Sequence, residues 1–174
     1  MNFSQLLKDV GVIKTNISSE TSFVGITEDV SKTTKLIPYI SLIKEREKSK
    51  EKINEAVRRG GAVICEALPE GFEGLYVLCK SAQAANAQIN SNLLGNPERE
   101  LKVIGVAGGS DVSRYRVCQM LRTILETGSK RCASLCGGEI YVGTAYRGTK
   151  TDKSPYKLYS LMKEALGAGD EYFI

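Results

Sequence analysis

The chain has 174 residues, of which 42% are hydrophobic and 25% are charged, and its formal net charge is +4. This composition suits a globular protein with a buried core, and so small a basic excess, with acids and bases interleaved, does not indicate a nucleic-acid partner. The absence of histidine excludes catalytic triads and metal sites that depend on an imidazole.

Short helices and strands are predicted along the first part of the chain. Apolar residues at helical spacing predict a helix over residues 3–10, which Gly11 ends. Residues 22–30 indicate a short strand followed by a polar turn. Residues 35–43 indicate a second strand at the edge of a sheet or bent within it, because Pro38 has no N–H to donate to a neighbouring strand.

The next segments favour a helix that alternates with buried strands. Residues 44–61 predict a charged helix that ends in two glycines. Residues 62–66 and 75–80 are continuous apolar runs, which are typical of strands covered on both faces. Residues 81–95 predict an Ala-rich helix. Glycine and proline within residues 95–100 then break the pattern and mark the best candidate for a domain boundary.

The second half also alternates between strands and helices, which indicates an α/β protein with a parallel sheet there. Strands are predicted over residues 101–108, 131–138, 139–146 and 170–174, and helices over residues 113–126 and 154–169. The first of these helices is expected to bury a face made of Val117, Met120, Leu121, Ile124 and Leu125.

Five cysteines are present, and no two of them form a CxxC motif. We interpret Cys65, Cys79 and Cys118, which lie in apolar runs or on a helical face, as core thiols in a reducing cytoplasm. Cys132 and Cys136 are close together, but a zinc site would need two more ligands that the sequence does not offer. A metal site is therefore not expected.

The N-terminal segment is not typical of a signal peptide, because Lys8 and Asp9 interrupt its apolar stretch. No apolar run approaches the ~20 residues that a membrane-spanning helix needs. We therefore expect a cytoplasmic protein without a membrane partner.

Residues 103–117 have the layout of a phosphate-binding loop, in which a strand enters a glycine turn and a helix follows. Such a loop binds phosphate through backbone N–H groups and the helix dipole, and a lysine reaches the outer phosphates. Here Val112 occupies the position of that lysine, while Ser113 stands at the position of the metal ligand. The Asp111 carboxylate would also repel a phosphate ~4 Å away by ~1–4 kcal/mol.

Two interpretations of this loop remain open. Ser110 or Asp111 could cap the following helix, so that the turn is structural and needs no ligand. Alternatively, the helix dipole could still support weak or altered anion binding. Arg114 and Arg116 would be the replacement cations, although nothing in their spacing aims them at the loop.

Residues 92–128 resemble the junction between the first and central domains of Mur ligases, with the UDP-N-acetylmuramoyl-tripeptide synthetases as the nearest likeness. In that family "GNP" precedes a strand and an ATP-binding loop of the type G-[VI]-T-G-T-N-G-K-T-T. "VGITEDVSK", residues 24–32, is similar to the family's G-[IV]-x-x-D-S-R stretch. Residues 53–66, 75–97 and 154–174 also resemble family segments, in the right order.

The resemblance implies a small Mur-ligase N-terminal-like α/β domain over residues 1–98, which is UDP-binding-like. A truncated P-loop-like parallel α/β domain would follow over residues 99–174. It also implies two vestigial sites. The nucleotide loop would consist of Gly108, Gly109, Ser110, Ser113 and Arg114, and the UDP site would include Asp29 and Ser31.

The departures from the family pattern decide the function that we expect. The loop segment T-G-T-N-G-K-T-T corresponds to residues 107–114, where one glycine stays in place and the lysine is lost. Only Asp29 remains of the D-S-R motif. The family's D-G-H-x-F segment corresponds to "REKSKEK", which lacks its glycine and histidine. The chain also ends early in the central domain. Ligation through an acyl phosphate needs ATP, magnesium and closure of three domains.

We therefore expect a degenerate Mur-ligase-like protein without ligase activity of its own, acting as a binding or scaffolding module linked to peptidoglycan synthesis. No resident cofactor is expected, and ATP and magnesium would bind only if the loop still functions. Open sheet edges predict a homo-oligomer or a partner chain that covers the second sheet. The alternatives are a subunit of a split ligase that retains nucleotide or UDP-sugar binding, and an unrelated function such as redox sensing through Cys132 and Cys136.

Overall fold

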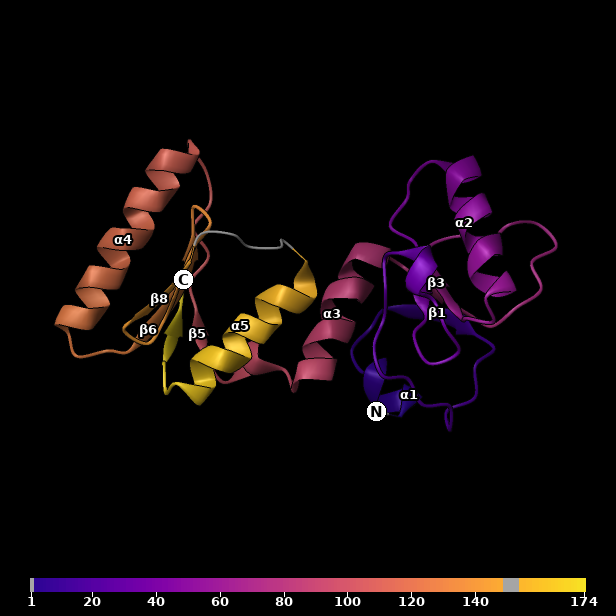
Figure 1. Cartoon of the computed structure of the whole chain (residues 1–174), viewed down its shortest axis with the longest axis horizontal. Helices are drawn as coiled ribbons and strands as arrows, with labels where there is room; N and C mark the ends of the chain where they lie inside the picture. The colour runs from indigo at the N-terminus through magenta and orange to yellow at the C-terminus, as the bar shows by residue number, and fades with distance from the viewer. Residues whose placement is uncertain (1, 149–153) are drawn as a thin grey trace. The chain divides into compact units, whose positions relative to one another are not determined.

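The computed structural model describes residues 2–148 and 154–174, and its contacts divide the chain into two compact units (Figure 1). Unit 1 ends at Leu93 and unit 2 begins at Leu94, within the last turn of helix α3 (Ala82–Leu94). The sequence placed the boundary a few residues later, between residues 98 and 99. The two units are described separately below.

Unit 1 contains a four-stranded sheet in the order β1-β4-β3-β2. Its strands are β1 (Val12–Thr15), β2 (Tyr39–Ile40), β3 (Val63–Cys65) and β4 (Tyr76–Cys79). Strands β2, β3 and β4 are parallel, and β1 pairs antiparallel with β4. Strand β2 directly follows Pro38 and lies at an edge of the sheet, which confirms the position inferred from that proline.

The short strand predicted in the first part of residues 22–30, before a polar turn, does not form. Thr27 makes only an isolated bridge to Tyr39, and the chain then enters a 3-10 turn, η1 (Val30–Lys32). The first helix is also shorter than predicted, since α1 spans Phe3–Leu6 and Asp9 adopts a left-handed φ of 63° that turns the chain towards β1. Both errors concern apolar segments too short for their periodicity to distinguish the possible structures.

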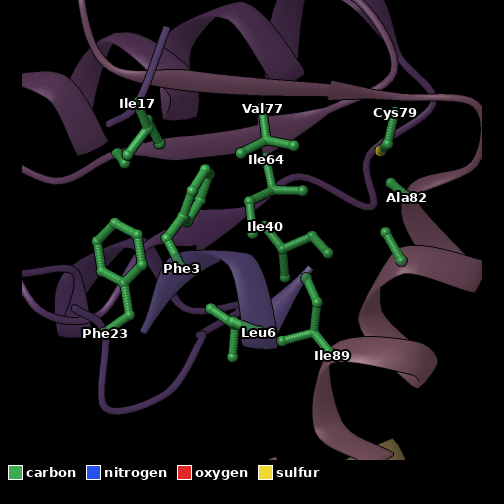
Figure 2. Packing of buried hydrophobic residues seen from close by; sticks show 12 residues of the cluster. Phe3, Leu6, Ile17, Phe23, Ile40, Ile64, Val77, Cys79, Ala82 and Ile89 are labelled. Atoms are coloured by element: carbon green, nitrogen blue, oxygen red, sulfur yellow. The ribbon is translucent and has the colours of Figure 1, made fainter. Parts of the chain in front are cut away.

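The sheet of unit 1 is covered on both faces, as its continuous apolar strands predicted. On one face Ile40, Ile64 and Val77 pack with residues of α1 and α3 (Figure 2). On the other face Tyr39, Val63 and Cys65 pack against α2 (Arg46–Arg58). The buried Asn92 of α3 donates hydrogen bonds of 2.9 and 2.8 Å to the carbonyls of Leu6 and Lys8, which tie the end of α1 to α3.

Unit 2 contains a five-stranded sheet in the order β5-β9-β6-β7-β8. Its strands are β5 (Lys102–Val103), β6 (Cys132–Cys136), β7 (Glu139–Val142), β8 (Ala145–Gly148) and β9 (Tyr172–Phe173). Strands β5, β9 and β6 are parallel, whereas β6, β7 and β8 are antiparallel. The sheet is therefore mixed, and only its first three strands have the expected parallel arrangement.

The antiparallel part has a local cause in the turn between β6 and β7. Gly137 and Gly138 adopt φ values of 60° and 89°, which suit a tight hairpin, and a hairpin makes neighbouring strands antiparallel. The last strand, β9, lies between β5 and β6 rather than at an edge. The edges of this sheet are therefore β5 and β8.

The two long helices of unit 2 pack with different sets of sheet residues. Helix α5 (Pro155–Gly167) packs on Ala133, Ile140 and Val142, whereas α4 (Asp111–Thr127) packs on Cys132 and Cys136. A further 3-10 turn, η2 (Pro97–Arg99), precedes β5.

Helix α4 buries a different face from the one that its sequence predicted. Leu121 and Leu125 pack towards the sheet as expected, but Val117, Met120 and Ile124 are 44%, 65% and 67% exposed. Cys118 lies inward, as expected of a core residue. Arg122 completes this face, and its guanidinium lies 3.8 Å from the centre of the Tyr141 ring. The hydropathy pattern of the sequence did not predict that the Arg122 side chain would be buried against the sheet.

Cys118 and Cys136 form a disulfide that joins α4 to β6, so the interpretation of Cys118 as a free thiol was wrong. Cys65, Cys79 and Cys132 are buried free thiols. Burial raises the pKa of Cys65 to about 12 and those of Cys79 and Cys132 to about 11. These three thiols are therefore protonated and unreactive at neutral pH.

Candidate functional site

The loop that leads into α4 ends in a self-contained helix cap. Gly108 and Gly109 adopt left-handed φ values of 97° and 54°, which a glycine accepts without strain. Ser110 is the N-cap, and its hydroxyl accepts a hydrogen bond of 3.2 Å from the backbone N–H of Ser113. Of the two residues proposed as the cap, Ser110 therefore has this role, and Asp111 is the first residue of the helix.

Arg114 folds back onto the loop, although its position in the sequence did not predict this. Its guanidinium donates hydrogen bonds of 2.8 Å to the carbonyl of Gly108 and 3.0 Å to that of Gly109, and it forms an ion pair with Asp111. The planar fork of arginine allows one side chain to hold all three groups. The cation that could have met a phosphate is thus engaged with the loop itself.

The neighbouring side chains complete this closed arrangement. The hydroxyl of Ser113, at the expected metal-ligand position, lies 3.0 Å from that of Ser110 in a mutual hydrogen bond. Val112, at the lysine position, is 60% exposed and has no polar group. The loop thus brings together all five residues predicted for the nucleotide site, but in contacts with one another.

The residues predicted for the UDP site form a local turn instead of a cavity wall. Asp29 is the N-cap of η1 and accepts hydrogen bonds of 3.0 Å from the backbone N–H of Ser31 and 2.7 Å from its hydroxyl. These two bonds, followed by the nearby charge of Lys32, lower the pKa of the exposed Asp29 carboxyl. Arg59 donates to the carbonyl of Ser31 at 3.2 Å. A role in UDP binding stays a prediction.

A cavity of about 680 Å³ lies elsewhere in unit 1, where the loops after the parallel strands β2, β3 and β4 meet the first turns of α2 and α3. In open α/β sheets, ligands bind at this carboxyl edge of the strands. Neither Asp29 nor Ser31 lines the cavity. Sequence reasoning missed it, although the ends of three consecutive parallel strands are the signal that could have located it.

The cavity walls are polar and carry both signs of charge. Its basic residues are Lys44, Lys50 and Lys80, and its acidic residues are Glu47, Glu66 and Glu70. Glu66 is already engaged, since it accepts a hydrogen bond of 2.8 Å from the backbone N–H of Ala82 at the start of α3. Lys44, Lys50 and Lys80 thus share the cavity with the carboxylates of Glu47 and Glu70.

The residues present in the loop do not fit the ATP and magnesium that the family resemblance implies. The lysine position holds Val112, and the serine at the metal position and the arginine beside it are bonded within the loop. Within residues 2–148 and 154–174, no three His, Cys, Asp or Glu side chains are grouped so that they could hold a metal ion. In the same residues no helix is long and apolar enough to cross a membrane.

Comparisons with curated proteins and with solved structures both find Mur ligases. No family model matches the chain. The UDP-N-acetylmuramoyl-L-alanyl-D-glutamate--2,6-diaminopimelate ligase of Clostridium perfringens is 25% identical over 127 residues, which are 70% of this chain and 25% of that protein. The ligase of the same name from Parabacteroides distasonis is 27% identical over 124 residues, which are 69% of this chain and 25% of that protein. The chain thus spans about a quarter of the length of these curated relatives.

Solved structures show the same relationship at the level of the fold. A structure of a UDP-N-acetylmuramoyl-L-alanyl-D-glutamate--2,6-diaminopimelate ligase matches 99% of this chain and 35% of its own, with a TM-score of 0.69 and 16% identity. The UDP-N-acetylmuramoylalanyl-D-glutamyl-2,6-diaminopimelate--D-alanyl-D-alanyl ligase of Acinetobacter baumannii matches 99% of this chain and 35% of its own, with a TM-score of 0.54 and 18% identity. The chain is related to the Mur ligases.

Proposed function

We propose that this relative of the Mur ligases does not carry out ATP-dependent ligation through its own loop, and that it acts as a binding or scaffolding module in peptidoglycan synthesis. The link to that process rests on the relatives, whose names describe ligases of UDP-N-acetylmuramoyl peptides. The inference that the chain does not carry out ligation rests on the loop that leads into α4. One observation carries it: the Arg114 guanidinium is bonded to the carbonyls of Gly108 and Gly109 and to Asp111.

A nucleotide would have to displace these contacts before it could bind. The guanidinium would have to leave two carbonyl partners, and the phosphate would approach the Asp111 carboxylate, a like charge that costs ~1–4 kcal/mol at ~4 Å. The backbone donors and the dipole of α4 would still attract an anion, but each such terminal interaction contributes only ~0.3–1 kcal/mol at an exposed site. The repulsion and the lost contacts outweigh this attraction, so the loop favours its closed, unliganded arrangement.

A phosphate-release assay tests the absence of ligation. Purified protein is mixed with ATP, magnesium, UDP-N-acetylmuramoyl dipeptide and candidate amino acids, and phosphate is measured over time. We expect no release above that of the buffer. Release that depends on all of the substrates and disappears in Ser113→Ala would contradict the proposal, because it would place catalysis at this loop.

The binding role requires surfaces or cavities that remain available. In the second sheet the outer edges of β5 and β8 have no neighbouring strand in the part of the chain that the structure describes. An unpaired strand edge favours pairing with another chain. The module therefore either forms a homo-oligomer or pairs with a partner chain through these edges, and sedimentation measurements of the purified protein distinguish the two.

A second candidate function is favoured by the cavity of unit 1. Its volume of about 680 Å³ and its three lysines suit a polar, negatively charged molecule such as a UDP-sugar. The chain would then be a subunit of a split ligase that retains substrate binding. Calorimetric titration with UDP-N-acetylmuramoyl dipeptide tests this function. Saturable binding that is weakened at least tenfold by the Lys44→Ala/Lys50→Ala double change, and unaltered by Lys14→Ala in β1, would support it. Absence of binding at millimolar ligand would exclude it.

A further inference from the structure

The outward surface of helix α4 has a continuous apolar stripe, made of the exposed Val117, Met120 and Ile124. The exposed Ser113 precedes the stripe and the exposed Thr127 follows it. Along these five positions the spacing alternates between four and three residues. Such a spacing places side chains in one line along a helix, and it is the spacing of the seam through which two helices pack together. The stripe therefore has the pattern of a short helix–helix contact.

The stripe belongs to a helix whose opposite side is firmly held. The inner face of α4, made of Cys118, Leu121 and Leu125, packs on the sheet of unit 2. The Cys118–Cys136 disulfide also ties the helix to β6. A partner would thus meet a surface that is already formed, and binding would not have to order it. A preformed surface lowers the entropic cost of association.

The charges of α4 suit a second copy of the same helix that runs in the opposite direction. Arg116 borders the stripe near the start of the helix, and among the residues that the structure describes it has no ion-pair partner. The last turn contains the half-exposed Glu126 and no basic residue, although the negative end of a helix dipole favours a cation. In an antiparallel pair, Arg116 of each copy would lie beside the last turn of the other. In a parallel pair the two Arg116 side chains would meet and repel each other.

The stripe also suits the two-fold symmetry that most homodimers have. A two-fold axis near residue 122 would set Met120 of each copy against Ile124 of the other. Val117 would then lie against Thr127 of the other copy. The 17 residues of α4 extend over only about 25 Å, so one helix pair buries less than the ~800 Å² per partner of a standard interface. A dimer through this face is therefore expected to be weak.

We propose that two copies of this chain pair antiparallel through the outer faces of α4. Val117, Met120 and Ile124 form the centre of the contact, and Arg116 of each copy lies beside Glu126 of the other. The contact does not use the edges of β5 and β8, so it is separate from the strand pairing considered above. The size of the interface predicts a dissociation constant of about 10–100 µM. At about 1 µM the chain is then mostly monomeric, and denaturation at that concentration reports the monomer.

Sedimentation equilibrium of the full chain from about 1 to about 500 µM measures the pairing. Ile124→Lys should weaken the dimer at least about tenfold, because it places a charge in the apolar centre of the contact. Val24→Lys is the matched control, since Val24 is equally exposed but lies in unit 1, and it should leave the dissociation constant unaltered. At about 1 µM both variants should melt within about 2 °C of the natural sequence, because both side chains are exposed in the monomer.

Arg116→Gln tests the orientation of the two helices. In the antiparallel pair it should weaken the dimer by about threefold or more, because it removes the cation beside the last turn of the other copy. A tighter dimer in this variant would overturn the proposal, because only a parallel pair gains from the loss of this charge.

Three other results would also overturn the proposal. One is a chain that stays monomeric over the whole concentration range. Another is a dimer that Ile124→Lys leaves intact, or that Val24→Lys weakens equally, because the copies then pair through another surface such as the strand edges. The third is a melting temperature lowered by more than about 5 °C in Ile124→Lys at about 1 µM, because Ile124 is then covered within its own chain.

Discussion

Replacement of Arg114 by alanine tests whether this side chain closes the loop. Its guanidinium donates to two carbonyls at 2.8 and 3.0 Å, and the side chain is 38% exposed. Hydrogen bonds from a charged group contribute ~1.5–3 kcal/mol each, and this exposure reduces the sum to about 1–2 kcal/mol. For a unit the size of residues 94–174, Arg114→Ala should therefore lower the melting temperature by about 5–10 °C.

Thermal and urea denaturation of the purified variants measure this effect. Arg116→Ala is the matched control, because Arg116 is exposed on the same helix and belongs to no ion pair with a described residue. It should change the free energy of unfolding by no more than about 0.5 kcal/mol. Arg114→Lys should restore only part of the loss, since an ammonium group does not have the planar fork that spans both carbonyls. Equal stability of Arg114→Ala and Arg116→Ala would refute the reasoning.

Three further predictions concern the cap, a buried amide and the thiols. Ser110→Ala should lower the free energy of unfolding by about 1 kcal/mol because it removes the N-cap, and Asp111→Ala should lower it by less. A larger loss for Asp111→Ala than for Ser110→Ala in urea denaturation would assign the cap to Asp111. Asn92→Ala should lower the free energy of unfolding by about 1–3 kcal/mol, because it leaves the carbonyls of Leu6 and Lys8 without their donor. Gln88→Ala is the control and should lower the free energy of unfolding by clearly less. Burial raises the pKa of the Cys65 thiol in the folded state to about 12, so the unfolded state loses this proton first and the free energy of unfolding should fall as pH rises above about 9. Cys65→Ala should flatten that fall. An unchanged pH profile of stability in this variant would contradict the assignment.

Much of the architecture could be predicted from the sequence, because long amphipathic or Ala-rich helices and continuous apolar strands have clear patterns. The helices α2, α3, α4 and α5 and the strands β3 and β4 lie where their segments indicated. Strand β1 was missed, since it follows the short helix α1 directly and most of its residues are exposed. The separate strand β8 was missed because it shares one predicted run with β7, and only the turn between them divides the run.

The arrangement of side chains around the loop was harder to predict. The sequence showed that the lysine was absent, but it did not show that Arg114 would bond to the loop carbonyls, because this depends on the left-handed turn at Gly108 and Gly109. Likewise, the inner face of α4 includes Cys118 because β6 places Cys136 within bonding distance, a pairing that local periodicity does not encode.

The cavity of unit 1 illustrates the same limit. Its lining residues come from the ends of three strands and the starts of two helices, and none of these segments alone has a binding motif. Asp29 and Ser31 were chosen for their resemblance to a family motif, yet they bond to each other in a turn. Topology, rather than any local pattern, brings the lining residues of the cavity together.

The central claim is that the loop between β5 and α4 is closed by its own side chains and does not bind nucleotide. Isothermal titration of the full chain with Mg-ATP, in reducing and in oxidising buffer, tests it most directly. We predict no saturable heat up to millimolar ATP for the natural sequence, and measurable binding after the Asp111→Gly/Val112→Lys double change if the backbone turn is retained. Saturable binding by the natural sequence, lost in Ser113→Ala, would contradict the account and would support a working nucleotide site.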